Sequence, residues 1–150
     1  PPRQREALEL EALRLSIVRA DEMRSLIVPD LFLDELYAAT YHSIVSTPSL
    51  REAMEFGGPE VAELVQRLTV EDSDVDPMDV AGRLWQRYLE RRIEDCRREA
   101  RFATESAELR TLNDQMGWFK ARVAELPELD TRATAVAGLL AWFNGANPAT

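Results

Sequence analysis

The sequence predicts an all-α fold: a bundle of five or six helices, followed by a C-terminal helical hairpin that is reached through a long helix. Apolar residues recur at intervals of three and four almost throughout the chain, as they do along one face of a helix. Capping residues, prolines and glycines stand where these series stop and restart. No segment shows the alternation of apolar and polar residues that is typical of a half-buried strand.

The N-terminal segment predicts one long helix and two further helices. Apolar residues spaced by three and four indicate an amphipathic helix over residues 4–20. Asp21 is the candidate N-cap of a short second helix that ends before Pro29. Asp34 is the candidate N-cap of the third helix, because a short carboxylate side chain can accept hydrogen bonds from unsatisfied backbone N–H groups.

The next segment predicts two short helices. Thr47-Pro48 combines a capping hydroxyl with a proline at the first helical position, where the missing N–H costs nothing. Gly57-Gly58 is expected to end this fourth helix, and Pro59 to open the fifth. The fifth helix carries an apolar stripe that is expected to face the core and consists of Val61, Leu64, Val65 and Leu68.

The longest helical segment is predicted to follow an acidic loop at residues 71–76 and to open at Asp76-Pro77. No glycine or proline interrupts residues 83–116. Two apolar series run along this segment, but they are out of phase with one another. Because a slipped series marks a bend or a turn, we expect a break near residues 104–106.

The C-terminal segment predicts one more helix and completes the division of the chain. Pro127 ends the preceding helix, Asp130 is the candidate cap of the last one, and Gly145 is its candidate C-terminal stop. The predicted division is therefore a helical bundle over residues 1–103, including most of the long helix, and a helical hairpin over residues 104–150.

The composition argues against several classes of function. The formal net charge of −9 is opposite to the basic excess of nucleic-acid-binding surfaces. No apolar run approaches the roughly 20 residues that span a bilayer, and no secretory leader is recognisable. The start at Pro1-Pro2-Arg3, without a methionine, is typical of a fragment of a longer polypeptide. We therefore expect a cytoplasmic module that binds neither nucleic acid nor a membrane directly.

The sequence also predicts no catalytic residue, no metal site and no cofactor. His42 is the only histidine, has no evident metal-binding or catalytic partner and is expected to be a partly buried structural residue. Cys96 is the only cysteine and falls on the apolar stripe of the long helix, as expected for a small buried hydrophobe. The acidic loop at residues 71–76 lacks the glycine and the closing glutamate of a calcium-binding loop. No phosphate-binding or nucleophile motif is present.

The order of the predicted elements resembles a pattern shared by two replication modules. Residues 28–34, followed by Tyr37, Tyr41 and Ile44, are similar to segments of the bacterial primase C-terminal domain and of the N-terminal domain of the replicative hexameric helicase. Residues 60–71, an acidic loop and an arginine-rich helix over residues 83–101 resemble the primase version. The resemblance covers residues 5–126 and rests on helix lengths and apolar positions.

The resemblance to the primase family implies a non-catalytic helicase-binding module. Such a module docks on the N-terminal domain of the replicative helicase, recruits primase to the fork for RNA primer synthesis and modulates both enzymes. The catalytic domains of the parent primase lie elsewhere, and the module is expected to be a monomer or a weak dimer. The alternatives are the N-terminal oligomerisation domain of the helicase itself and a helical interaction adaptor unrelated to replication.

The candidate partner-binding residues lie in the predicted hairpin. Aromatic and aliphatic side chains there cover more than one helix face, which is more than a two-helix hairpin can bury against itself. The alternative is that this tail folds back on the bundle. The predicted contact residues are Trp118, Phe119, Arg122, Leu139, Trp142 and Phe143.

Overall fold

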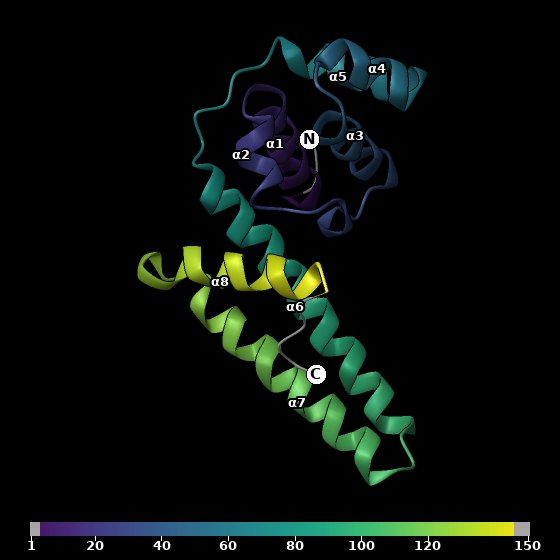
Figure 1. The fold of residues 1–150 in the computed structure, drawn as a ribbon, viewed down its shortest axis with the longest axis vertical. Coiled ribbons are helices and arrows are strands. Elements are labelled where there is room, and N and C mark those ends of the chain that lie inside the picture. The colour runs from purple at the N-terminus through teal and green to yellow at the C-terminus, as the bar shows by residue number, and fades with distance from the viewer. Residues whose placement is uncertain (1–3, 146–150) are drawn as a thin grey trace. The chain divides into compact units, whose positions relative to one another are not determined.

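A computed structural model describes residues 4–145, and it confirms the all-α prediction (Figure 1). These residues form eight α-helices and one short 3₁₀ helix, with no strand among them. In chain order the elements are α1 (Gln4–Val18), α2 (Ala20–Arg24), η1 (Pro29–Leu31), α3 (Glu35–Ser46), α4 (Leu50–Gly57), α5 (Pro59–Thr69), α6 (Pro77–Phe102), α7 (Ser106–Glu125) and α8 (Leu129–Phe143).

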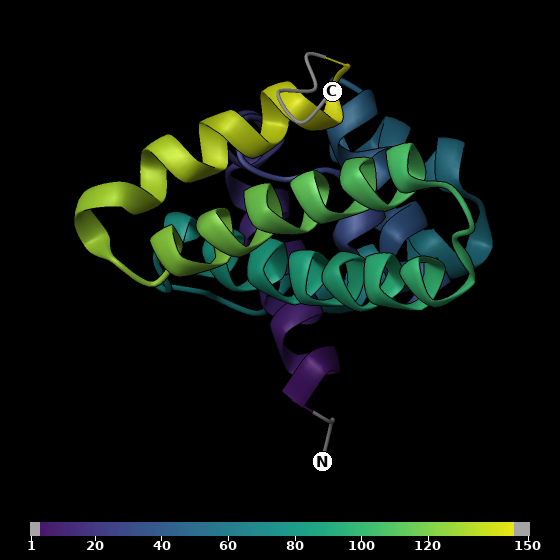
Figure 2. The same ribbon diagram turned by 90° about the horizontal axis from the view of Figure 1, so that it is seen from below.

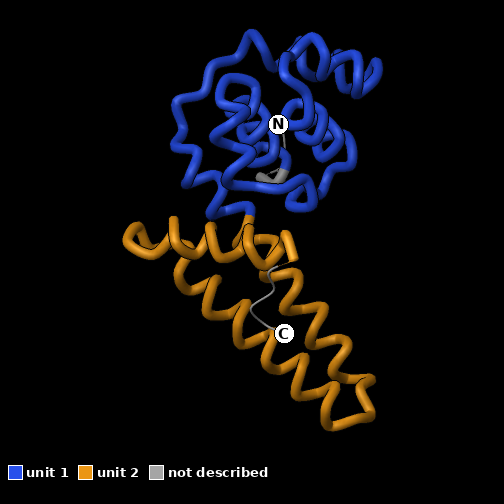
Figure 3. Tube along the Cα trace, in the orientation of Figure 1, with its two compact units in different colours: residues 1–84 blue, residues 85–150 orange. Residues whose placement is uncertain are grey.

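The chain divides into two compact units, unit 1 (Pro1–Leu84) and unit 2 (Trp85–Thr150), as Figure 3 shows. The division falls inside α6, whereas the sequence placed the boundary at residues 103/104. Two ribbon views show that the part of α6 in unit 2 runs alongside α7 (Figures 1 and 2). This part of α6 therefore belongs with the hairpin, and α8 packs with α7 in the same unit.

Several helix ends lie where the local sequence predicts them. The Asp34 carboxylate caps α3 by accepting hydrogen bonds from the backbone N–H groups of Leu36 (2.9 Å) and Tyr37 (3.1 Å). Gly58 ends α4 with a φ of +88°, a conformation that strongly favours glycine. Pro59 then opens α5. These ends are set by residues next to one another in sequence, which is why the sequence predicts them.

Three predicted caps are wrong. Thr47 ends α3 instead of opening α4, and the side chain of Ser49 caps α4 by accepting from the Glu52 N–H at 3.2 Å. Asp21 and Asp130 lie within the first turns of α2 and α8, each two residues past the N-cap, which is Arg19 in α2 and Glu128 in α8. Carboxylates are favoured in a first turn by the helix dipole, so composition alone does not separate that position from the cap.

The predicted break in the long helical segment is confirmed. Helix α6 ends at Phe102 and α7 begins at Ser106, so the two out-of-phase apolar series belong to two different helices. Each series supplies the buried face of its own helix. The buried residues are Leu89, Ile93 and Cys96 on α6, and Leu112 and Phe119 on α7.

Unit 1 contains two buried polar side chains that join distant segments. The Tyr41 hydroxyl donates to the carbonyl oxygens of Ile27 (2.8 Å) and Met23 (3.1 Å), and burial raises the pKa of Tyr41 above its usual value. The Glu9 carboxylate is 1% exposed. It accepts hydrogen bonds from the backbone N–H groups of Leu33 and Asp34, both at 3.1 Å. These contacts fix the connection that leads into α3.

Candidate partner-binding surface

Six aromatic side chains of unit 2 pack together, and we refer to them as the aromatic cluster. Each of the three helices of the unit contributes two of them. Their ring centroids are separated by 5.2 to 6.5 Å, in tilted and edge-to-face arrangements that suit the quadrupoles of aromatic rings. The cluster consists of Trp85 and Tyr88 on α6, Trp118 and Phe119 on α7, and Trp142 and Phe143 on α8.

Trp142 is the most connected ring of the aromatic cluster. Its centroid lies 5.2 Å from that of Phe119 and 5.7 Å from that of Trp118, and it also contacts Tyr88. The Arg92 guanidinium lies 5.6 Å from the Phe119 centroid and 5.9 Å from the Trp142 centroid. A cation at this distance is attracted by the negative faces of both rings. Arg92 therefore links α6 to the aromatic residues of α7 and α8.

A second cation contact lies at the half-buried edge of the aromatic cluster. The Arg122 guanidinium is 5.0 Å from the Trp118 ring centroid. The same guanidinium bonds the Glu125 carboxylate at 2.6 Å, one turn further along α7. The ion pair holds the guanidinium against the ring, so Trp118 and Arg122 present a joined aromatic and cationic surface.

Five of the six predicted contact residues lie in or against the aromatic cluster, and Leu139 is the exception. Two of the six have no solvent-exposed surface. Phe119 and Leu139 are both 0% exposed. They are core residues of unit 2 and cannot touch a partner in this conformation. The predicted residues that keep partial exposure are Trp118, Arg122, Trp142 and Phe143.

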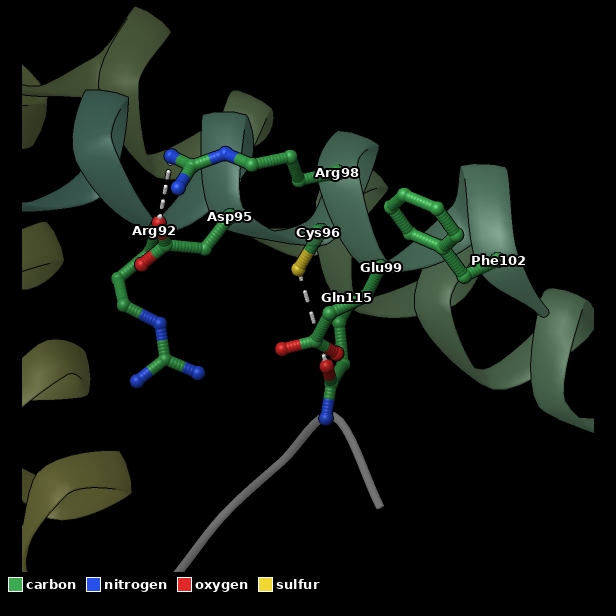
Figure 4. A pocket seen from close by; sticks show the side chains of 7 residues that line it. All are labelled: Arg92, Asp95, Cys96, Arg98, Glu99, Phe102 and Gln115. Carbon is green, nitrogen blue, oxygen red and sulfur yellow. Dashed lines mark hydrogen bonds and ion pairs between the residues drawn. The ribbon is translucent and has the colours of Figure 1, made fainter.

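Sequence reasoning missed Phe102, which ends α6 and is 81% exposed. Its ring borders a groove of about 480 Å³ between α6 and α7 (Figure 4). A signal for its exposure exists in the sequence, because Phe102 falls outside the apolar series of the long helix. The groove is lined by Arg92, Asp95, Cys96, Arg98, Glu99, Phe102 and Gln115.

The groove does not offer a reactive thiol. Cys96 is 3% exposed, and its Sγ donates to Gln115 Oε1 at 3.9 Å (Figure 4). Burial raises the pKa of Cys96, an effect that the nearby Arg92 guanidinium opposes. The side chain therefore stays a neutral thiol at physiological pH, and the prediction of a small buried hydrophobe at this position is confirmed.

The remaining candidates for chemistry have ordinary surroundings. His42 was expected to be partly buried, but it is exposed on α3, where its Nδ1 lies 3.3 Å from Ser46 Oγ and its ring lies 5.9 Å from that of Phe56. Within the described residues, no three side chains of the metal-binding types come together. None of the helices in residues 4–145 combines the length and apolar character needed to cross a membrane.

Charge is distributed unequally between the two units. Residues 1–84 contain 17 acidic and 8 basic residues, which gives a net charge of −9 for unit 1. Residues 85–150 contain 10 of each, so unit 2 is neutral overall. The whole formal charge of the chain therefore belongs to unit 1, and the aromatic cluster lies in a unit without net charge.

Comparisons with known proteins leave the family open: no protein-family model, no curated protein and no solved structure matches the chain.

Proposed function

We propose that this chain is a non-catalytic protein-binding module and, following its resemblance, the helicase-binding C-terminal domain of a bacterial primase. The observation that carries the proposal is the half-buried edge of the aromatic cluster, where the Arg122 guanidinium lies over the Trp118 ring. Tryptophan and arginine are enriched in the residues that dominate binding energy at protein interfaces. A helical unit followed by a long helix and a hairpin is also the arrangement that the resemblance implies.

Binding of this kind would act by tethering. A module that docks on the N-terminal domain of the replicative helicase raises the local concentration of primase over unwound DNA without any affinity for DNA. The negative charge of unit 1 is compatible with that role, because it disfavours direct contact with phosphates. The proposed contact residues are Trp118, Arg122, Trp142 and Phe143, together with Phe102 at the end of α6.

Calorimetric titration with the helicase N-terminal domain from the same source tests this proposal. Phe102→Ala is expected to weaken binding by about 1–3 kcal/mol, the range of an interface hot spot. Because Phe102 is 81% exposed, the substitution leaves the fold intact and its effect reports on binding. Leu129→Ala is the matched control, since Leu129 is equally exposed at 81% but lies at the start of α8, outside the groove.

The two variants separate the possible results. The proposal expects Leu129→Ala to bind as tightly as the unmodified chain. Equal weakening by both variants would indicate general surface hydrophobicity instead of a specific contact. Unaltered binding by Phe102→Ala would remove the end of α6 from the interface, and absence of binding by the unmodified chain would contradict the proposed partner.

A further inference from the structure

Unit 1 contains a groove of about 310 Å³ between the start of α3 and one face of α5, which the proposed function does not use. Its α5 side follows from helical spacing, because residues 60, 63, 64 and 67 share one face. Its α3 side is held in place by the Asp34 cap. The groove is lined by Asp34, Leu36, Tyr37, Glu60, Glu63, Leu64 and Arg67.

The groove combines an apolar floor with carboxylates. Leu64 is buried and Leu36 and Tyr37 are half-buried, and together these side chains form the apolar part of the groove lining. Glu60 and Glu63 are exposed, and neither forms an ion pair with any residue that the structure describes. The lining contains one basic side chain, that of Arg67, against the carboxylates of Asp34, Glu60 and Glu63, so negative charge is in excess in the groove.

The electrostatic surroundings of Tyr37 reflect the same excess of negative charge. Burial raises the pKa of Tyr37, and the carboxylates of Asp34, Glu6 and Glu9 raise it further, whereas Arg67 lowers it. The surrounding unit carries the entire net charge of −9. A ligand with positive charge is favoured in this groove, and an acidic one is repelled.

We propose that this groove binds an arginine side chain from a basic segment of a partner protein. A guanidinium can stack on the Tyr37 ring while its N–H groups donate to the Glu60 and Glu63 carboxylates. The methylene stem of the arginine would lie on Leu36 and Leu64. Lysine fits less well, because an ammonium group is a compact, strongly hydrated charge that neither stacks nor bonds two carboxylate oxygens in parallel.

This proposal is independent of the helicase. It concerns a site in unit 1, whereas the proposed helicase contact lies in unit 2. It also differs from general attraction of cations to an acidic protein, because the aromatic ring and the two carboxylates define a particular location. The test therefore has to compare the groove with acidic residues elsewhere in the same unit.

Fluorescence anisotropy with the full chain and a labelled peptide of alternating arginine and alanine provides that test. The double variant Glu60→Gln, Glu63→Gln is expected to bind the peptide about five- to tenfold more weakly, the effect of two exposed charge contacts. The double variant Asp72→Asn, Asp74→Asn removes the same charge from an exposed loop and is expected to lose less than about twofold. Equal losses in the two double variants, or failure of the peptide to bind the unmodified chain, would overturn the proposal.

A third variant examines the role of the ring. Tyr37→Leu keeps apolar volume in the groove but removes the aromatic face, so affinity for the arginine peptide is expected to fall about threefold. A peptide of alternating lysine and alanine is expected to bind the unmodified chain more weakly and to be affected less by this change. Unchanged affinity of Tyr37→Leu for the arginine peptide would show that no guanidinium stacks there and would overturn the assignment.

Discussion

Replacing Phe119 by alanine is expected to destabilise unit 2 by about 3–5 kcal/mol, the usual cost of removing a large buried aromatic side chain. Phe119 is 0% exposed and contacts the rings of Trp118 and Trp142, and Arg92 lies over its face. Removal of the ring leaves a cavity and takes away one of the two rings that Arg92 faces. Any loss of partner binding by this variant would therefore follow from loss of structure.

Urea denaturation followed by tryptophan fluorescence measures this effect selectively. All three tryptophans (Trp85, Trp118 and Trp142) belong to unit 2, so their emission reports the unfolding of that unit. Phe102→Ala serves as the control, because a phenylalanine that is 81% exposed contributes within about 0.5 kcal/mol to stability. Similar unfolding midpoints for the two variants would contradict the burial of Phe119 in the aromatic cluster.

Replacing Glu9 by alanine is expected to destabilise unit 1 by about 3 kcal/mol, because two hydrogen bonds to a charged acceptor are lost. The carboxylate is 1% exposed and accepts from the N–H groups of Leu33 and Asp34. Without it, two N–H groups are left without their acceptor next to the cap of α3. The loss should therefore spread to the start of that helix.

Far-UV circular dichroism during urea denaturation measures this effect, with two comparison variants. Glu9→Gln keeps one acceptor oxygen and the shape of the side chain, and it is expected to lose less stability than Glu9→Ala. Asp72→Ala removes a carboxylate from an exposed loop and is expected to change stability by less than about 0.5 kcal/mol. Equal stability of Glu9→Ala and Asp72→Ala would show that the buried carboxylate does not fix the connection into α3.

The helices were predictable because their signals are local. Periodicity gave the helical segments, and the phase slip between two apolar series gave the break between α6 and α7. Asp34 was predictable as a cap because it bonds N–H groups two and three residues away. The exposure of Phe102 was missed, although it is predictable from the same helical phase, because Phe102 falls outside the apolar series of α6.

The remaining features depend on contacts between residues far apart in sequence. The Glu9 carboxylate accepts from the N–H groups of Leu33 and Asp34, which follow it in sequence by 24 and 25 positions. No spacing rule identifies contacts between residues so far apart. Phe119 and Leu139 are apolar residues that the sequence allows either in a core or on a binding surface. The packing of α8 decides between these outcomes, and it also leaves only part of the predicted contact surface accessible.

Co-sedimentation of the chain with the intact hexameric helicase from the same source tests the central claim most directly. The chain alone is expected to sediment as a monomer or weak dimer of 17.0 kDa subunits. In the mixture it should move with the faster helicase boundary, and Phe102→Ala should return it to the slow boundary at concentrations near the dissociation constant. A chain that forms stable rings by itself, or that stays in the slow boundary beside the helicase, would contradict the account.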